Sequence, residues 1–159
     1  MAAPITTDSV WREVEKQTFA VLSWVTPKGE ARSAGIIYLV RDRTLFIGTG
    51  ASSWKAKQIS HNPAVALNVL IQKRIPLLPW IKIPDATIAF RGQASVRAFS
   101  EVDPSIYKEL TKGMADDPEI HADTCILVIE PEGHFVTYGV GVPLLDMRDP
   151  RKAEGRAPV

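Results

Sequence analysis

The residues of this chain best suited to chemistry lie together at one strand-to-helix turn. Gly48 and Thr49 end an apolar run, a second glycine follows, and Ser53, Lys55 and Lys57 open a stretch with helical spacing. The first N–H groups of a helix have no partner within the helix, and the helix dipole is positive at that end. Hydroxyl and ammonium groups add donors and positive charge to the same place. This combination predicts an anion cradle, for which a phosphate monoester is the natural ligand.

The same turn has a second interpretation, an ordinary capped helix with two solvated lysines. Serine and glycine commonly precede helices, and the chain has neither GxxxxGK[ST] nor GxGxxG after a strand. Other kinds of site have less support. The histidines lack metal-ligand spacing, no Ser/His/Asp order stands out, and His61 is better interpreted as a polar residue at a helix end. Cys125 is the only cysteine and is expected to be a buried, inert thiol, so no metal site is predicted.

The elements that must position this turn are mostly strands. Short apolar runs separated by turn residues predict strands over residues 19–25, 34–40, 44–49, 64–71, 86–98, 124–130 and 134–142. The first three are expected to form a meander of two successive hairpins, and the last two a hairpin around residues 131–133. A bulge is expected at a glycine, Gly92, within the fifth run.

Helices are expected to be few and short. Thr7 or Asp8 would cap one near the N-terminus, whose spacing places Val10, Trp11 and Val14 on one face. A serine at 52 or 53 would cap the helix that carries the lysines through residue 60. Aspartate–proline pairs at 103–104 and 117–118 begin two more, the first of which Gly113 would end. The predicted fold class is mainly β with short helices (α+β), an antiparallel barrel. We expect one domain over residues 1–159, with an N-terminal helix in 1–17 and a Pro/Arg-rich tail in 143–159.

Long apolar runs rather than clean alternation indicate strands that are covered on both faces. The barrel interior would cover one face and a second subunit the other, which predicts a dimer. Residues 75–84 contain three prolines among large apolar side chains, so they are expected to form a loop. A loop this apolar needs a cover. It could cover an apolar substrate, pack against the other subunit or touch a membrane surface. We interpret it as a dimer contact or a lid, with no stable membrane association.

Four segments resemble the pyridoxamine 5'-phosphate oxidase-like split-barrel family. Residues 49–59, with Thr49, Ser53 and Lys55-Ala56-Lys57 in sequence, are similar to its FMN-phosphate segment, and residues 62–67 resemble the Asn-Pro step into the next strand. Residues 34–37 and 90–94 resemble the family's ring-contacting strand and its Gly-x-Ala strand. In element order the resemblance covers roughly residues 10 to 140.

This resemblance implies a dimeric split β-barrel that binds FMN at the subunit interface. The serine and the first lysine would hold the phosphate with the second lysine close by. The Gly–Thr pair would flank the ring or ribityl chain, and the backbone of residues 35–37 would hydrogen-bond the polar edge of the ring. The cofactor-binding residues so implied are Gly35, Ile36, Ile37, Gly48, Thr49, Ser53, Lys55 and Lys57.

The chain departs from the oxidase itself at three places. Trp54 and Ala34 stand where the oxidase looks to have arginines, and its substrate-phosphate pattern of arginine and histidine is missing from the C-terminal part. Another redox substrate is therefore expected in place of a B6 vitamer. Part of the family uses the deazaflavin coenzyme (coenzyme F-420), whose polyglutamate tail would suit the basic pair Lys73–Arg74 and the basic C-terminal tail.

The preferred hypothesis is an oxidoreductase that transfers hydride between FMN, or alternatively the deazaflavin, and a small organic substrate. The alternatives are a non-catalytic carrier of flavin, haem or another tetrapyrrole, and an empty barrel that serves as a dimeric interaction protein. The 159 residues are 45% hydrophobic and 23% charged with a net charge of +1, which argues against disorder and against nucleic-acid binding. Without a signal-peptide pattern or a membrane span, a cytoplasmic location is expected.

Overall fold

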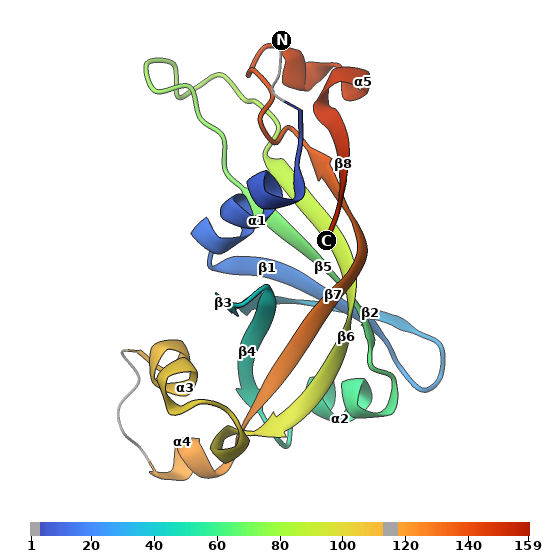
Figure 1. Ribbon diagram of the computed structural model, residues 1–159, viewed down its shortest axis with the longest axis vertical. Helices are drawn as coiled ribbons and strands as arrows, with labels where there is room; N and C mark the ends of the chain where they lie inside the picture. Colours follow the sequence, from blue (N-terminus) through green and yellow to red (C-terminus); the bar gives the residue numbers. More distant parts are fainter. Residues whose placement is uncertain (1–3, 113–117) are drawn as a thin grey trace.

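The computed structural model describes residues 4–112 and 118–159 (Figure 1). Strands predominate in it and the helices are short, which confirms the predicted fold class. The strands are β1 (Phe19–Val25), β2 (Ala31–Ile37), β3 (Leu39–Arg41), β4 (Thr44–Gly50), β5 (Ala64–Ile71), β6 (Ala86–Ala98), β7 (Thr124–Tyr138) and β8 (Glu154–Pro158). The helices are α1 (Thr7–Lys16), α2 (Trp54–His61), α3 (Pro104–Leu110), α4 (Pro118–Ala122) and α5 (Pro150–Ala153), with single 3-10 turns η1 (Phe99–Glu101) and η2 (Asp146–Arg148). Gly113 and Asp117, expected at a helix end and a helix start, lie outside the described residues.

The strands form one antiparallel sheet that curls into a split barrel. Its hydrogen-bonded order is β2-β1-β5-β6-β7-β4-β3, with β8 added beside β7. The two ends of this order, β2 and β3, are consecutive in the chain and separated only by Tyr38. A sheet that begins and ends on neighbouring residues must curl back on itself (Figure 1). Closure is incomplete, since no ladder joins β2 to β4.

Both hairpins expected over residues 19–49 form, but the meander is wrong in its middle strand, which is broken into β2 and β3. β1 pairs with β2, and β3 pairs with β4, but the two hairpins lie at opposite ends of the sheet order. The predicted strand over 34–40 instead starts at Ala31 and breaks at Tyr38. The Tyr38 hydroxyl donates a 2.6 Å hydrogen bond to the Val14 carbonyl of α1, so the break fastens the barrel to its N-terminal helix.

The expected C-terminal hairpin is also wrong. Residues 124–138 form one continuous strand, β7, which pairs with β6 along its length and shifts register between Ala89 and Arg91. Of the residues that indicated a turn, Pro131 and Glu132 are paired with β6, and Gly133 begins the irregularity between this pairing and Val136. The tail from residue 143 is not simply irregular either, since its last residues form β8 against the end of β7.

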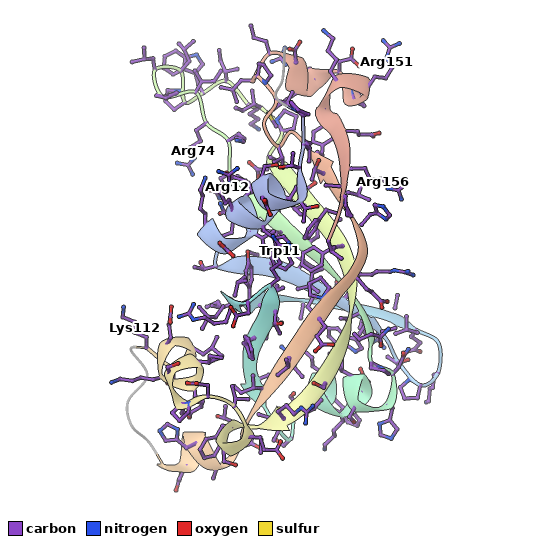
Figure 2. The ribbon with its side chains drawn as sticks, in the orientation of Figure 1. Trp11, Arg12, Arg74, Lys112, Arg151 and Arg156 are labelled. Carbon is purple, nitrogen blue, oxygen red and sulfur yellow. The ribbon has the colours of Figure 1, made fainter. Side chains whose placement is uncertain are left out.

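The core fills the barrel interior and continues under α1. β1 buries alternate residues, and Val10, Trp11 and Val14 of α1 are buried as the helical spacing predicted (Figure 2). The Trp11 ring packs edge-on against Phe135 of β7, with 5.3 Å between ring centroids. α1 also contacts β3 and β8.

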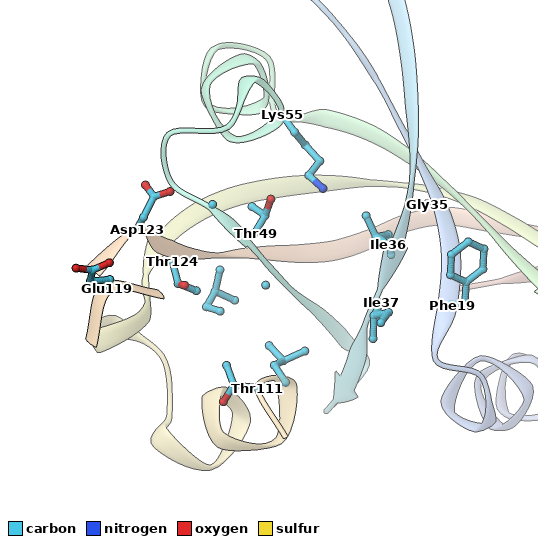
Figure 3. A pocket seen from close by; sticks show the side chains of 14 residues that line it. Phe19, Gly35, Ile36, Ile37, Thr49, Lys55, Thr111, Glu119, Asp123 and Thr124 are labelled. Atoms are coloured by element: carbon cyan, nitrogen blue, oxygen red, sulfur yellow. The ribbon is translucent and has the colours of Figure 1, made fainter. Parts of the chain in front are cut away.

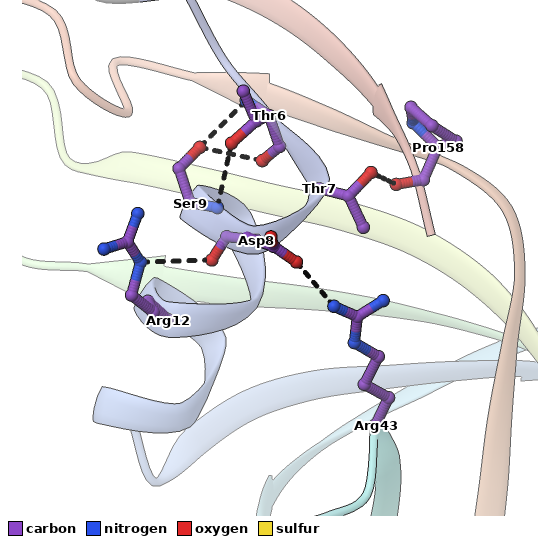
Figure 4. A network of polar contacts seen from close by, with 7 residues as sticks. All are labelled: Thr6, Thr7, Asp8, Ser9, Arg12, Arg43 and Pro158. Carbon is purple, nitrogen blue, oxygen red and sulfur yellow. Dashed lines mark hydrogen bonds and ion pairs between the residues drawn. The ribbon is translucent and has the colours of Figure 1, made fainter.

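The N-terminal helix begins one residue earlier than expected. Thr6 caps it through a reciprocal pair of hydrogen bonds with Ser9, which is a capping box (Figure 4). Asp8 pairs with Arg43 of the β3–β4 turn at 2.6 Å, and the Thr7 hydroxyl donates to a β8 carbonyl at 2.7 Å. These contacts join the two ends of the chain to the barrel. Among the described residues, no helix has the length and apolar character of a membrane span.

Candidate functional site

A cavity of about 860 Å³ opens where the barrel is split, between β2 and β4 (Figure 3). β2 is at the end of the sheet order, so one of its edges has no ladder partner among the described strands. On β4 the ladder with β3 covers only residues 44–46, which leaves residues 47–50 unpaired on that edge. The cavity therefore has backbone N–H and C=O groups on two facing edges, and each needs a hydrogen-bond partner.

The structure brings six of the eight predicted cofactor residues to this one cavity. Those that line it are Gly35, Ile36, Ile37, Gly48, Thr49 and Lys55. They come from β2, β4 and the first turn of α2, which are up to twenty residues apart in sequence. Ser53 and Lys57 are not among the lining residues.

The cavity is mainly apolar on one side. Phe19, Ile36, Ile37 and Ile126 contribute large apolar surfaces, and two of these side chains are solvent-exposed in the single chain, Phe19 by 48% and Ile37 by 67%. Thr49 and two further threonines add hydroxyl groups. A flat, partly aromatic ligand with polar edges fits this distribution of surfaces.

Lys55 is the lysine that enters the cavity. Figure 3 shows its ammonium group directed between Thr49 and the Gly35–Ile37 segment. Burial lowers the pKa of Lys55. Among the ion pairs formed by the described residues none involves Lys55. A partly desolvated ammonium with no carboxylate partner favours an anionic ligand at this place.

Lys57 lies on the other side of the same helix. Residues two apart on an α-helix point roughly 200° apart, so the two lysines of a Lys-x-Lys pattern cannot share one face. Lys57 instead places its ammonium 5.6 Å from the ring centroid of Trp54 and lines a separate hollow of about 440 Å³ with Lys28 and His61. The His61 ring bonds the Lys57 carbonyl at 2.8 Å, in agreement with its interpretation as a helix-end residue.

Ser53 acts as the N-cap of α2. Its hydroxyl oxygen accepts a hydrogen bond from the Ala56 N–H at 3.2 Å. This satisfies one of the free donors of the helix start. The hydroxyl proton can still be donated, and the Trp54 and Lys55 N–H groups have no partner among the described residues.

An aspartate that the sequence did not single out occupies the rest of the turn. The Asp123 carboxylate accepts from the Ser52 N–H at 3.1 Å and from the Ser52 hydroxyl at 2.9 Å, and the Asp123 carbonyl accepts from the Ala51 N–H at 2.6 Å. The turn that leads into α2 thus already holds a carboxylate supplied by the chain. The signal available in the sequence was weak, since Asp123 merely precedes the strand that pairs with β4.

The pKa of Cys125 is affected by two charged groups of the cavity. The thiol is buried, as expected, and its pKa is raised by burial and by the Asp123 carboxylate but lowered by the Lys55 ammonium. Both charged groups line the cavity, whereas Cys125 itself does not. A buried thiol with a raised pKa is a poor nucleophile.

The segment between β6 and β7 closes the far side of the cavity. η1, α3 and α4 pack together through the tilted aromatic rings of Phe99, Tyr107 and His121. Leu110, Thr111 and Glu119 reach the cavity from this segment. Figure 3 shows Glu119 and Asp123 on the side opposite to β2. No group of histidine, cysteine and carboxylate side chains suited to a metal occurs in the described parts of the chain.

Comparison with known proteins agrees with this fold. No family profile matches the chain, and no curated protein matches it in sequence. Among solved structures, an F420 reductase superposes with a TM-score of 0.57 at 21% identity, covering 76% of this chain and 90% of the other. A candidate pyridoxamine 5'-phosphate oxidase from Listeria innocua gives 0.62 at 18% identity, covering 79% and 93%.

A third similar structure is a haem storage protein from Vibrio cholerae, with a TM-score of 0.65 at 14% identity over 86% of this chain and 98% of the other. At these identities the comparisons establish the fold. The chain has the split-barrel fold of the pyridoxamine 5'-phosphate oxidase-like proteins, as its residue motif indicated.

Proposed function

We propose that this split-barrel chain is a flavin-binding oxidoreductase, with FMN in the cavity between β2 and β4 and hydride transfer to or from a small organic substrate. The observation that carries the proposal is the position of Lys55. A lysine without an ion pair among the described residues enters an apolar cavity between two unpaired strand edges. Such a site can bind a phosphate and a flat ring at the same time.

The residues present fit FMN in three respects. The cavity volume of about 860 Å³ lies within the usual range for cofactor sites. Ile36 and Ile37 offer an apolar surface to the ring, while the backbone of the same segment offers hydrogen bonds to its polar edge. Lys55, with the free N–H groups at the start of α2, would hold the phosphate.

FMN would supply the hydride chemistry, because the ring itself accepts and donates the electron pair. The protein's own residues would bind and orient the ring and exclude water from one of its faces. Lys55 would fix the phosphate end. Gly35 leaves room for the Phe19 ring of the cavity wall, which an added Cβ at this position would meet at 2.8 Å. Because the ring carries the hydride chemistry, the proposed reaction requires no pair of side chains for acid–base catalysis.

A second copy of the chain is proposed to complete the site. The outer face of the sheet carries an uncharged row of small and medium residues, which runs across five paired strands through Gly35, Val21, Asn68, Ala89 and Val136. A neighbouring row, formed by Ser33, Ser23 and Ala66, is also small and uncharged, and it ends at the charged Arg91. These residues are exposed or half-exposed in the single chain.

This face is continuous with the cavity, because Gly35 belongs to both. The exposed Phe19 and Ile37 side chains lie at the same margin and need a cover. A homodimer formed through this face would shield them and place the cofactor at the subunit interface. The dimer proposal therefore rests on an exposed uncharged sheet face and not on the fold alone.

The deazaflavin coenzyme is a second candidate, and one observation favours it. The Asp123 carboxylate already occupies donors of the turn, so Lys55 is opposed by a negative charge near the phosphate position. The phosphate monoester of FMN carries up to two negative charges, whereas the deazaflavin coenzyme carries its phosphate as a diester with one. A singly charged group needs less compensation in such a site.

A haem carrier has less support, although a haem storage protein shares the fold. Haem iron is held by histidine, cysteine, methionine or tyrosine side chains. None of the residues lining the cavity in the described part of the chain is of these types. A carrier of flavin without turnover remains the main alternative to the enzyme.

The test is a titration of the purified protein with FMN, with the deazaflavin coenzyme and with haem, followed by absorbance and fluorescence. We expect sub-micromolar binding of one of the first two, and then turnover when an electron donor and a small oxidised acceptor are supplied. Binding without turnover across a substrate screen would indicate a carrier. Binding of neither flavin would refute the proposal.

A further inference from the structure

The loop between β5 and β6 carries the most exposed group of large apolar side chains in the described chain. Leu77 is 87% exposed, Trp80 73% and Leu78 38%, and these three residues are called the loop tip below. Figure 1 shows the loop projecting from the end of the barrel that also carries α5. An apolar tip of this size in water indicates a surface that binds something.

The loop tip has a defined shape without being a strand or a helix. Two tight turns form it, closed by a 3.1 Å hydrogen bond from the Leu78 N–H to the Ile75 carbonyl and a 3.0 Å bond from the Ile81 N–H to the Leu78 carbonyl. None of the residues that line the cavity at the barrel split belongs to this loop. Within one chain, the loop is therefore not a lid over that cavity.

Positive charge is concentrated at the stem of the loop. Lys73 and Arg74 stand on one side of the stem and Lys82 on the other, and none of them takes part in an ion pair among the described residues. Arg74 extends outward below the tip in Figure 2. Asp85, the single acidic residue of the loop, accepts a 3.3 Å hydrogen bond from the Lys73 backbone N–H.

From this separation of an apolar tip and a cationic stem we propose that the loop docks reversibly on the surface of an anionic lipid bilayer. The tip would enter the boundary between headgroups and acyl chains, where tryptophan is favoured, and the three stem cations would lie at the level of the lipid phosphates. The bilayer is a better occupant than a second copy of this chain. A second copy can bind to the uncharged sheet face beside the cavity. If two copies instead met through this loop, the cations of the two stems would face each other without counter-ions.

The proposal is independent of the cofactor and can be tested with the full chain. Wild type and a Leu77→Ser/Trp80→Ser variant are sedimented with vesicles of phosphatidylcholine and phosphatidylserine in a ratio of about three to one, and with vesicles of phosphatidylcholine alone. Trp54→Ser is the matched control, because Trp54 is 77% exposed but lies on α2. The melting temperature of each variant shows that it is folded.

We expect wild type and the control to bind the anionic vesicles, to bind the neutral vesicles much less, and to dissociate as salt is added. The tip variant should lose binding. Lys73→Glu/Lys82→Glu should bind at least about 25-fold more weakly, since each cation near an anionic surface contributes about fivefold.

The proposal is overturned if wild type does not bind anionic vesicles, or if the tip variant binds as well as wild type. If the tip variant lowers the oligomeric mass in solution while wild type ignores vesicles, a second copy covers the loop and the bilayer is excluded. If the tip variant fails to fold, the stem variant decides the outcome by the same comparison.

Discussion

The two lysines of α2 provide a direct test of the site, because they are chemically identical, two residues apart and on opposite faces. Lys55→Met removes the ammonium group that enters the cavity while keeping a side chain of similar length. Lys57→Met makes the same chemical change beside Trp54, outside the cavity. Any effect of charge on the whole helix is common to both variants. The difference between them therefore isolates the cavity.

The expected magnitude follows from the contact that is lost. A hydrogen bond to a charged group contributes about 1.5–3 kcal/mol, which corresponds to an increase in Kd of about 10- to 150-fold. Lys55→Met should weaken binding of the phosphate-bearing flavin by this factor. Lys57→Met should change it by no more than about threefold, as for an exposed charge. Fluorescence titration at fixed ionic strength measures both.

Stability should change in the opposite direction from affinity. Burial lowers the pKa of Lys55 in the folded chain. The unfolded state therefore binds more protons, and wild-type stability should rise with pH between the lowered folded pKa and the ordinary lysine pKa. Lys55→Met should remove this slope and should unfold in urea no earlier than wild type near neutral pH.

Two results would refute this reasoning. If Lys57→Met weakened binding as much as Lys55→Met, the phosphate would lie in the hollow beside Trp54. If Lys55→Met left affinity unchanged in a folded protein, the lysine would have no part in ligand binding. A strong loss of stability in Lys55→Met without ligand would instead show that the ammonium group is structural.

Three further predictions concern the surroundings of the site and the barrel. The pKa of Cys125, followed by its rate of reaction with a thiol reagent, should fall in Asp123→Asn and rise in Lys55→Met; shifts in the same direction would contradict the charge arrangement. Burial raises the pKa of Tyr38, so just above the ordinary tyrosine pKa its hydroxyl loses a proton in the unfolded state but not in the folded state. The free energy of unfolding should therefore fall as pH rises through that range. Tyr38→Phe should flatten that loss and cost about 0.5–1.5 kcal/mol near neutral pH in urea unfolding, because the Val14 carbonyl loses one of its two donors and keeps the Gln17 N–H; an unchanged slope would argue against it. Gly92→Ala should destabilise the barrel by about 1–3 kcal/mol, since overpacking has this cost. The added carbon would lie 2.7 Å from a β7 carbonyl oxygen, and an unchanged urea midpoint would show that the strands can separate there.

Local patterns in the sequence predicted most elements well. β1, β5 and β6 have the predicted bounds, and α2 begins after Ser53 as its capping pattern indicated. The spacing of Val10, Trp11 and Val14 identified the buried face of α1. Each of these features depends on residues within a few positions of one another, so the sequence alone is sufficient for them.

The incorrect predictions, the meander and the C-terminal hairpin, concern features that depend on strand partners distant in sequence. Proline and glycine at 131–133 are as compatible with a bulge as with a turn, and only the long β6 partner decides that β7 runs straight through. Likewise, two hairpins in succession do not determine whether they lie side by side. The middle strand breaks at Tyr38, and β5 and β7, which are distant in sequence, pair with the outer edges of β1 and β4 and so place the two hairpins at opposite ends of the sheet order.

For the candidate site, the sequence determined the chemical groups and the tertiary structure decided which of them meet. The strand-to-helix turn, its serine cap and its lysines are encoded locally, and the helical period already places Lys55 and Lys57 on opposite faces. Only the curling of the sheet brings Gly35 of β2 opposite Gly48 of β4, and only the pairing of β4 with β7 delivers Asp123 to the turn. The reason is that hydrogen-bonding periodicity acts over a few residues, whereas a cavity is formed by surfaces whose contact depends on the packing of the whole barrel.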